Sequence, residues 1–152
     1  MGAFAIPPRR KWSAIVPTLR IIRADVVPVV GPVVGPVVGP VVGPVEAVSA
    51  WCSDALNACI HGAGRSRHLE FSAIDLIVPD RDDKQAMFTD LCAMHRAVGT
   101  RNNMGFGAYF NSSQPLRYGR GQFHVDAAGY RTWGFDYTNK SSGCHDVKVV
   151  TM

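Results

Sequence analysis

The spacing of apolar residues along the chain predicts three helices. Residues 11–24 place apolar side chains three or four positions apart, at Trp12, Ile15, Val16, Leu19 and Ile22, which is typical of a helix with one buried face. Residues 53–60 form a second, shorter candidate that begins at a serine or aspartate cap. Residues 82–97 form the third, with acidic residues in the first turn and an apolar face made by Met87, Leu91 and Met94.

Short alternating runs predict strands in the second half of the chain. Residues 73–79 are β-branched and apolar and stop at a proline, which indicates a mostly buried strand carrying Asp75. A period of two in residues 122–126 sends Phe123 and Val125 to one face, and Gln122, His124 and Asp126 to the other. Residues 105–110 predict a further strand, and Trp133 is expected to pack after a turn at Gly129. This order predicts an α+β fold, a small antiparallel sheet with packed helices.

A low-complexity segment, residues 26–45, separates the first helix from the strands. The unit Val-Val-Gly-Pro repeats in tandem from Val29 to Pro44. Its charge-free length of about twenty residues is that of a membrane span, but a proline at every fourth position would leave many backbone groups unsatisfied in lipid. We therefore predict an extended, turn-rich insert with no stable membrane span, whose removal leaves the fold intact.

Composition and charge describe an ordinary globular domain. The 152 residues are 47% hydrophobic and 18% charged, enough for one core, so a single domain over residues 1–152 is expected. Sixteen basic against twelve acidic residues give a net charge of +4, which favours anionic partners. Because the arginines are scattered and no basic stripe is interleaved with aromatic residues, nucleic acid is not predicted as a partner.

Three residues with side chains that commonly bind zinc lie on or beside the predicted strands. His68 precedes the strand that carries Asp75, and His124 lies on the polar face of a later strand. Two imidazoles and one carboxylate are ordinary zinc ligands, and three protein ligands leave a fourth position open for water. Asp126 shares a face with His124 and suits two roles, a general base or a carboxylate that orients the imidazole.

Several motifs together resemble one family of enzymes. Ser66, His68, Ala73 and Asp75 fit the pattern S-x-H-x-x-G-x-A-x-D, with Phe71 in place of the glycine. Residues 45–57, 105–110 and 123–133 are similar, in the same order, to the family segments V-x-V-x-S-[GA]-[YW]-R-S-x-x-x-N, G-x-G-x-Y and F-x-H-x-D. The chain thus resembles the zinc D-alanyl-D-alanine peptidases, a group that includes vancomycin-resistance dipeptidases and the Hedgehog amino-terminal domain.

This resemblance implies a fold, a cofactor and a substrate. It implies a Hedgehog-like or DD-peptidase-like domain that binds zinc through His68, Asp75 and His124 and hydrolyses peptide bonds in peptidoglycan stem peptides, as a carboxypeptidase or an endopeptidase. Beside these ligands in the sequence, Ser66, Arg67 and Gln122 are predicted to contact the substrate. The substrate implies the periplasm or the cell wall, although no signal peptide is predicted at the amino terminus.

Two positions depart from the family pattern. Cys52 stands where the family has an arginine that pairs with the substrate carboxylate, and a thiol offers no cationic fork. Arg65, Arg67 and Arg131 are candidate substitutes. Gly121 stands where many relatives carry a carboxylate base, which leaves Asp126 or Glu70 for that role. An alternative function is therefore a catalytically impaired, zinc-stabilised module that binds the cell wall.

For the cysteines and the other histidines, the sequence supports only general predictions. Four cysteines allow three disulfide pairings, and the sequence does not choose among them. Residues beyond Asn139, Cys144 included, are expected to form a weakly ordered terminus. The other histidines are expected at the surface or at helix ends, namely His61, His95 and His145.

Overall fold

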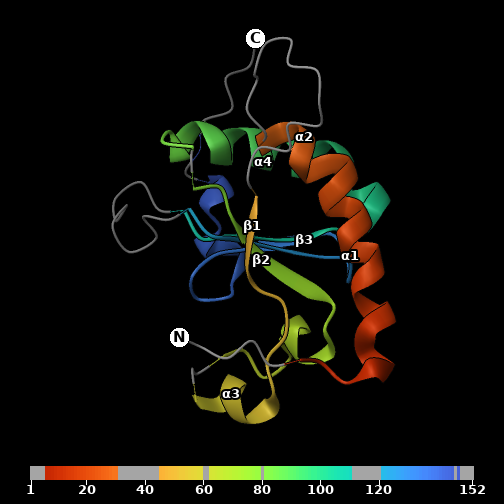
Figure 1. Cartoon of the computed structure of the whole chain (residues 1–152). Coiled ribbons are helices and arrows are strands. Elements are labelled where there is room, and N and C mark those ends of the chain that lie inside the picture. The colour runs from red at the N-terminus through yellow and green to blue at the C-terminus, as the bar shows by residue number, and fades with distance from the viewer. Residues whose placement is uncertain are drawn as a thin grey trace.

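The computed structural model describes residues 6–30, 45–59, 62–79, 81–110, 121–145 and 147. Five strands form one sheet in the order β1-β2-β4-β3-β5 (Figure 1). Their bounds are β1 Glu46–Ser49, β2 Ala73–Ile77, β3 Gly105–Ala108, β4 Phe123–Asp126 and β5 Arg131–Trp133. The predicted α+β class is confirmed by this sheet and the helices around it.

The sheet is not wholly antiparallel. The pairs β1–β2, β2–β4 and β3–β4 are antiparallel, as predicted, but β5 runs parallel to β3. We did not predict β5, because Arg131–Trp133 is only three residues long and shows no alternation that separates it from a turn. Its place at the edge brings Arg131 level with Gly105 and Trp133 level with Gly107.

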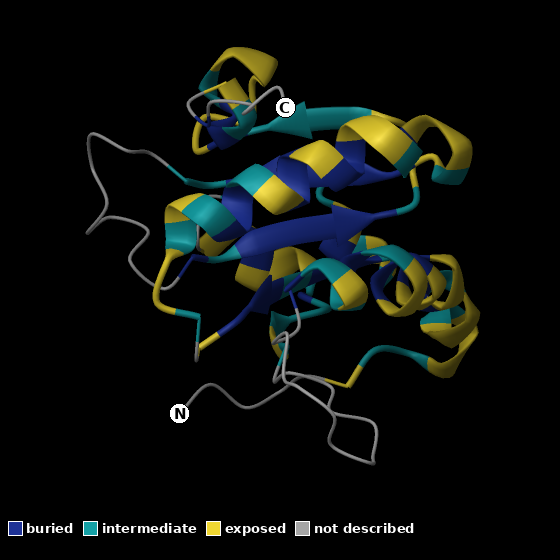
Figure 2. Ribbon diagram, turned by 90° about the horizontal axis from the view of Figure 1, so that it is seen from above, coloured by how far each residue is buried: buried dark blue, intermediate teal, exposed yellow. Residues whose placement is uncertain are grey.

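The longest helix, α4 (Lys84–Asn102), covers one face of the sheet. Asp83 caps it by accepting a hydrogen bond from the amide of Ala86 at 2.9 Å. The predicted apolar face is confirmed, since its three residues are at most 8% exposed. Figure 2 shows the central strands buried and the outer faces of the helices exposed. The helix runs past the predicted end at Ala97 to Asn102, and the cap residue Asn103 follows with a left-handed φ of 52°.

The amino-terminal helical run is longer than predicted, and the predicted apolar stripe is confirmed only in part, at Ile15 and Ile22. It comprises η1 Arg9–Ile15, α1 Val16–Ile21, η2 Ile22–Val26 and α2 Val27–Val30. Trp12, Val16 and Leu19 are exposed, whereas the buried side includes Ile15, Ile21 and Ile22. The physical reason is local: η1 is a 3₁₀ helix and η2 a π-helix, so the run does not keep the 3.6-residue period assumed from the sequence.

The start of the valine-rich segment is helical rather than extended. Val26 and Val30 are buried at 0% and 1% exposure within the main core, so they cannot be removed without opening a cavity. Packing of α2 against α4 supplies the tertiary contacts that a four-residue helix needs. Residues 31–44, the rest of the predicted insert, lie outside the described residues.

The second predicted helix is confirmed as α3 (Asp54–Cys59). The hydroxyl of Ser53 accepts a hydrogen bond from the amide of Leu56 at 3.2 Å, as a serine cap does. In Figure 1, α3 lies on the opposite side of the sheet from α4. The sheet therefore has a core face under α4 and a second face toward α3, and the second face carries the polar side chains of β2 and β4.

Residues 139–145 form short helical turns, contrary to expectation, whereas residues 146 and 148–152 lie outside the described residues. The turns are η5 (Asn139–Ser141) and η6 (Gly143–His145), and a disulfide joins Cys144 to Cys92 of α4. The hydroxyls of Thr132 and Ser142 are hydrogen-bonded at 2.7 Å, which ties the segment to β5. Residues 139–147 contain few apolar side chains, so their hydropathy did not predict packing against the domain. The disulfide constrains this segment covalently, and hydropathy gives no information about a covalent cross-link.

The histidines outside the predicted ligand set have different environments. His95 is buried at 2% exposure, so its predicted surface position is wrong; it hydrogen-bonds the carbonyl of Met104 at 3.0 Å and stacks on Tyr130. His145 is exposed, as predicted, and His61 lies outside the described residues. Among the helices of the described ranges, none has both the length and the apolar content that crossing a bilayer requires.

Candidate metal centre

Strand pairing brings two of the predicted ligands together. Asp75 of β2 lies directly opposite His124 of β4, so both side chains leave the sheet on the same face. Their neighbours along the strands, among them Leu76 and Val125, point to the core under α4. Alternation along each strand therefore separates the ligand face from the core face.

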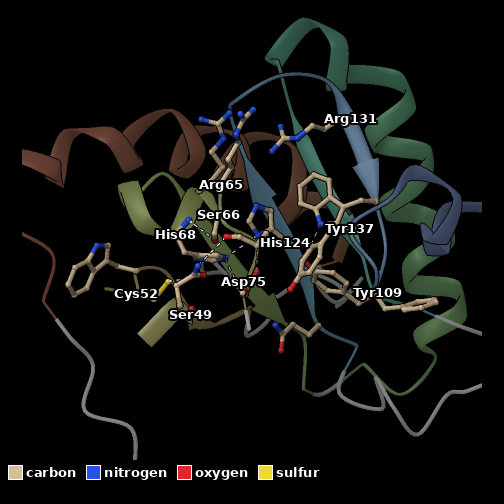
Figure 3. A pocket seen from close by; sticks show the side chains of 18 of the residues that line it. Ser49, Cys52, Arg65, Ser66, His68, Asp75, Tyr109, His124, Arg131 and Tyr137 are labelled. Carbon is tan, nitrogen blue, oxygen red and sulfur yellow. Dashed lines mark hydrogen bonds and ion pairs between the residues drawn. The ribbon is translucent and has the colours of Figure 1, made fainter. Parts of the chain in front are cut away.

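The third predicted ligand comes from a tight turn before β2. His68 lies in the 3₁₀ turn η3 (Arg67–Glu70), and the hydroxyl of Ser66 accepts a hydrogen bond from the His68 amide at 3.3 Å. Phe71 ends this turn with a left-handed φ of 53° and so redirects the chain into β2. The backbone of η3 thus aims the His68 ring at Asp75 and His124 (Figure 3).

The three side chains converge on one point. His68 Nε2 lies 3.1 Å from His124 Nδ1 and 3.2 Å from Asp75 Oδ2, and His124 Nδ1 lies 3.0 Å from Asp75 Oδ1. Tetrahedral zinc at its usual bond lengths separates its ligands by about 3.3 Å. The observed separations are therefore close to those that one zinc ion requires, and the three residues form the one group of this kind among the described residues.

The hydrogen bonds of His124 favour a cation at this point. Its Nε2 lies 2.9 Å from Asp126 Oδ2, so the ring proton belongs on Nε2 and Nδ1 presents a lone pair. That lone pair faces an oxygen of Asp75, which is also an acceptor. Two acceptors 3.0 Å apart repel each other unless a proton or a metal ion lies between them. The donor set is thus complementary to a divalent cation.

The pKa values of Asp75 and His124 indicate which charges are stabilised at the centre. Burial raises the pKa of the Asp75 carboxyl, but hydrogen bonds with His124 and His68 outweigh it and bring that pKa to about 2. Burial lowers the pKa of His124, but its bonds to Asp126 and Asp75 more than compensate, and the net shift is upward. Both shifts indicate that a positive charge between His124 and Asp75, whether a proton or a metal ion, is stabilised in this pocket.

Asp126 supports His124 from behind. It is 0% exposed, accepts from the Ala128 amide at 2.9 Å, and receives both guanidinium nitrogens of Arg131, at 3.0 and 2.6 Å. Burial raises its pKa, but the bonds from His124 and Arg131 lower it to about 2. Of the two roles open from the sequence, this geometry favours orientation of the imidazole, because both oxygens are engaged and neither faces the pocket.

Two glycines of β3 make room for this arrangement. A Cβ atom on Gly105 would lie 2.5 Å from Arg131 Nη1 and from Asp126 Oδ1, and one on Gly107 would lie 2.8 Å from His124 Cβ. These glycines face Asp126 and His124 directly across the strand pair. Sequence reasoning recorded the G-x-G-x-Y segment but missed its function. The signal was available, because glycine inside a strand marks a close approach.

The Asp126→Asn variant is expected to bind zinc about 10- to 100-fold more weakly than the wild type. The amide keeps the shape of the carboxyl but loses the charge that holds both His124 and Arg131. Competition with a chromogenic zinc chelator measures the affinity. Asp136→Asn, at an exposed turn that lies outside the centre, is the matched control. Equal affinities in Asp126→Asn and wild type would contradict the supporting role.

The centre opens onto a pocket of about 1080 Å³. The predicted substrate-contacting residues all line it, namely Ser66, Arg67 and Gln122, and so do the three predicted ligands. Aromatic side chains form much of the remaining wall, including Trp51, Tyr109, Trp133, Phe135 and Tyr137. The structure therefore brings the predicted site residues around one cavity, with Asp126 placed behind its wall.

No second carboxylate of the described residues lines this pocket. Glu70 points elsewhere and pairs with Lys11 at 3.4 Å. Gly121, where the motif pattern that the chain resembles has a carboxylate, has a left-handed φ of 64°, and a Cβ there would lie 2.8 Å from Lys84 Cδ. Residues 111–120, which fall outside the described residues, contain no aspartate or glutamate. A carboxylate other than Asp75 that could act as the general base is thus missing from the described wall.

Cys52 lines the pocket without offering a charge. It is 6% exposed, its amide donates to the carbonyl of His68 at 3.3 Å, and its thiol lies 3.9 Å from Asn57 Oδ1. Burial raises the pKa of the thiol, and the charges of Asp75 and Asp54 raise it further, so it remains a neutral thiol. Its role here is to fix the backbone on which His68 sits.

Comparison with known proteins identifies no relative of the chain. No family model, curated protein or solved structure matches the chain. The resemblance to zinc D-alanyl-D-alanine peptidases therefore rests on the ordered motifs.

Proposed function

We propose that the protein is a zinc peptidase of the D-alanyl-D-alanine peptidase type, with a related fold, that hydrolyses peptidoglycan stem peptides. The observation that carries the proposal is the convergence of His68, Asp75 and His124 at the wall of an open pocket. The pocket volume of about 1080 Å³ is sufficient for a short peptide. Three protein ligands match the pattern of catalytic rather than structural zinc sites.

We assign different roles in hydrolysis to the residues of the pocket. A zinc ion held by these ligands supplies Lewis acidity and a bound water of near-neutral pKa. Burial, with the nearby charge of Asp75, raises the pKa of Tyr109, so its phenol stays protonated at neutral pH as an O–H donor in the pocket. Ser66 and Gln122 add polar groups to the wall, and Asp126 holds the His124 ring in place.

Turnover is expected to be slow. General base catalysis contributes about 10²- to 10⁴-fold to such reactions, and the described wall lacks a carboxylate other than the ligand Asp75. This same observation favours a second candidate function, a catalytically impaired, zinc-stabilised module that binds the cell wall. The neutral Cys52 at the position of the family arginine favours it too.

The disulfide supports a site of action outside the reducing cytoplasm. Cys92 and Cys144 are bonded, and structural disulfides persist mainly in oxidising compartments such as the periplasm or the cell surface. Peptidoglycan lies in the same compartments, so the covalent chemistry of the chain and the proposed substrate agree.

The test is release of D-alanine from a synthetic stem pentapeptide that ends in D-alanyl-D-alanine. Zinc-loaded protein is expected to release it slowly, to lose the activity on chelation and to regain it on addition of zinc; mass spectrometry follows the products. The His68→Ala variant is the inactive control. Bound zinc with no cleavage of the pentapeptide or of a cross-linked dimer identifies the binding module instead. A wild-type protein that binds no zinc contradicts both functions.

A further inference from the structure

The amino-terminal helical run, residues 9–30, has one side in the core and one side in solvent. Its buried residues recur three or four positions apart, at Ile15, Thr18, Ile22, Val26 and Val30. Exposed residues with the same helical spacing lie on the other side, namely Val16, Leu19, Arg20 and Arg23. Figure 1 shows the run at one edge of the molecule, so this outer side faces away from the sheet.

Large apolar side chains are exposed on this outer side. Trp12, Val16 and Leu19 are each at least 40% exposed. The indole nitrogen of Trp12 donates to the carbonyl of Pro7 at 2.8 Å, which holds the ring at the surface. Single exposed apolar residues are common and need no explanation. Three on adjacent turns of one element form a patch of the kind that marks an interaction site.

The accessible charges of the run have one sign. Residues 9–30 contain four arginines and one lysine, but a single acidic residue, Asp25. Asp25 accepts a hydrogen bond from Asn102 of α4, and the ammonium of Lys11 donates to the carbonyl of Leu69 at 2.6 Å. The four arginines are exposed and have no acidic partner within the described ranges: Arg9, Arg10, Arg20 and Arg23. The outer side is therefore basic as well as apolar.

This combination suits the surface of a bilayer that contains anionic lipids. An interfacial helix places tryptophan and aliphatic side chains at the boundary of headgroups and acyl chains, and its basic residues beside lipid phosphates. A soluble polyanion would pair with the arginines but leave the apolar side chains in water. A second copy of this chain would bring arginines against arginines across a two-fold axis, which like-charge repulsion opposes.

The run is already folded and fastened to the rest of the domain. The hydroxyl of Thr18 donates to the carbonyl of Ser72 at 2.7 Å, and the bond from Lys11 ties the first turn to η3. At the other end, α2 packs against α4. Binding to a surface therefore carries no cost of helix formation, unlike the binding of a segment that folds only on contact.

We propose that residues 9–23 bind the surface of an anionic phospholipid bilayer, with the apolar patch of Trp12, Val16 and Leu19 at the acyl boundary and the four arginines on lipid phosphates. The run lies along the surface and does not cross it. This inference goes beyond the proposed function and does not depend on the metal centre, since none of these residues lines the pocket.

Co-sedimentation of the full-length protein with lipid vesicles tests the proposal. Binding to phosphatidylcholine vesicles that contain about 30% phosphatidylglycerol is expected to be at least about 10-fold tighter than binding to phosphatidylcholine alone. Brominated acyl chains report on depth, because they quench tryptophan emission on contact. They are expected to quench the wild type, and Trp12→Phe is expected to abolish most of that quenching.

Matched variants separate the contributions of charge and apolar contact. Arg20→Gln/Arg23→Gln and Val16→Ser/Leu19→Ser are each expected to weaken binding to the anionic vesicles by about 10-fold or more. The control Arg96→Gln/Arg101→Gln removes the same charge from exposed positions of α4 and is expected to bind within about threefold of the wild type. Circular dichroism checks that each variant is folded.

Three results would overturn the proposal. The first is a wild type with no preference for the anionic vesicles. The second is an equal loss in the arginine variant and its control on α4, which would show a response to net charge alone. The third is full binding by Val16→Ser/Leu19→Ser, which would show a purely electrostatic surface suited to a soluble polyanion. The His68→Ala variant is expected to bind vesicles as the wild type does, so loss of zinc leaves this test intact.

Discussion

The His68→Ala variant is expected to carry less than about a tenth of the zinc of the wild type, which we expect to hold about one ion per chain. Removal of His68 leaves two protein ligands, Asp75 and His124, and a pair of ligands from a sheet does not retain zinc against dialysis. Plasma mass spectrometry after dialysis against a weak chelator measures the content. Thermal unfolding without added zinc shows whether the variant still folds.

Two further variants sharpen this result. Asp75→Asn keeps the side-chain shape but removes the negative charge, so it is expected to lose most of the zinc while the sheet stays intact. His145→Ala removes an equivalent imidazole from the exposed turn η6 and is expected to leave the zinc content unchanged. Full zinc content in His68→Ala would show that the ligand assignment is wrong.

Replacement of Cys144 by serine is expected to lower the free energy of unfolding by about 4 kcal/mol. The disulfide closes a loop with a sequence separation of 52 residues, and a cross-link over that length removes much of the conformational freedom of the unfolded chain. The same bond holds η6 against α4 and, through Ser142, the end of β5. Urea unfolding followed by circular dichroism, under oxidising conditions, measures the change.

The free cysteine Cys59 provides the control for that experiment. It is exposed, so Cys59→Ser is expected to change the stability by less than about 0.5 kcal/mol. Reduction of the wild type should shift its midpoint as far as Cys144→Ser does, and reduction of the Cys144→Ser variant should change nothing further. A midpoint that reduction leaves unmoved would contradict the Cys92–Cys144 pairing.

The ligand face of the sheet was predictable because it depends on local geometry. In a strand, successive side chains point to opposite faces, so Gln122, His124 and Asp126 had to share a face wherever the strand was placed. The same argument applies to the apolar face of α4. The full buried face of the amino-terminal helix was not predictable in this way, since its 3₁₀ and π turns have periods that differ from 3.6 residues.

The supporting residues depended on contacts between distant parts of the chain. Arg131 was one of several scattered arginines in the sequence, and only the parallel pairing of β5 with β3 brings it to Asp126. His95 was predicted at the surface or at a helix end, but it is buried within α4 beside Tyr130 and Met104. The order of the carboxy-terminal segment likewise depended on the disulfide to α4.

By itself, the sequence determined the α+β class, the residue types of the candidate ligands and the strand face that His124 shares with Asp126. These follow from side-chain chemistry and from repeats of two or 3.6 residues, which neighbouring residues establish among themselves. The tertiary structure decided the convergence of the three candidate ligands and the burial of Asp126 behind His124. Strand register and turn geometry govern those features, and both depend on which distant segments pack together.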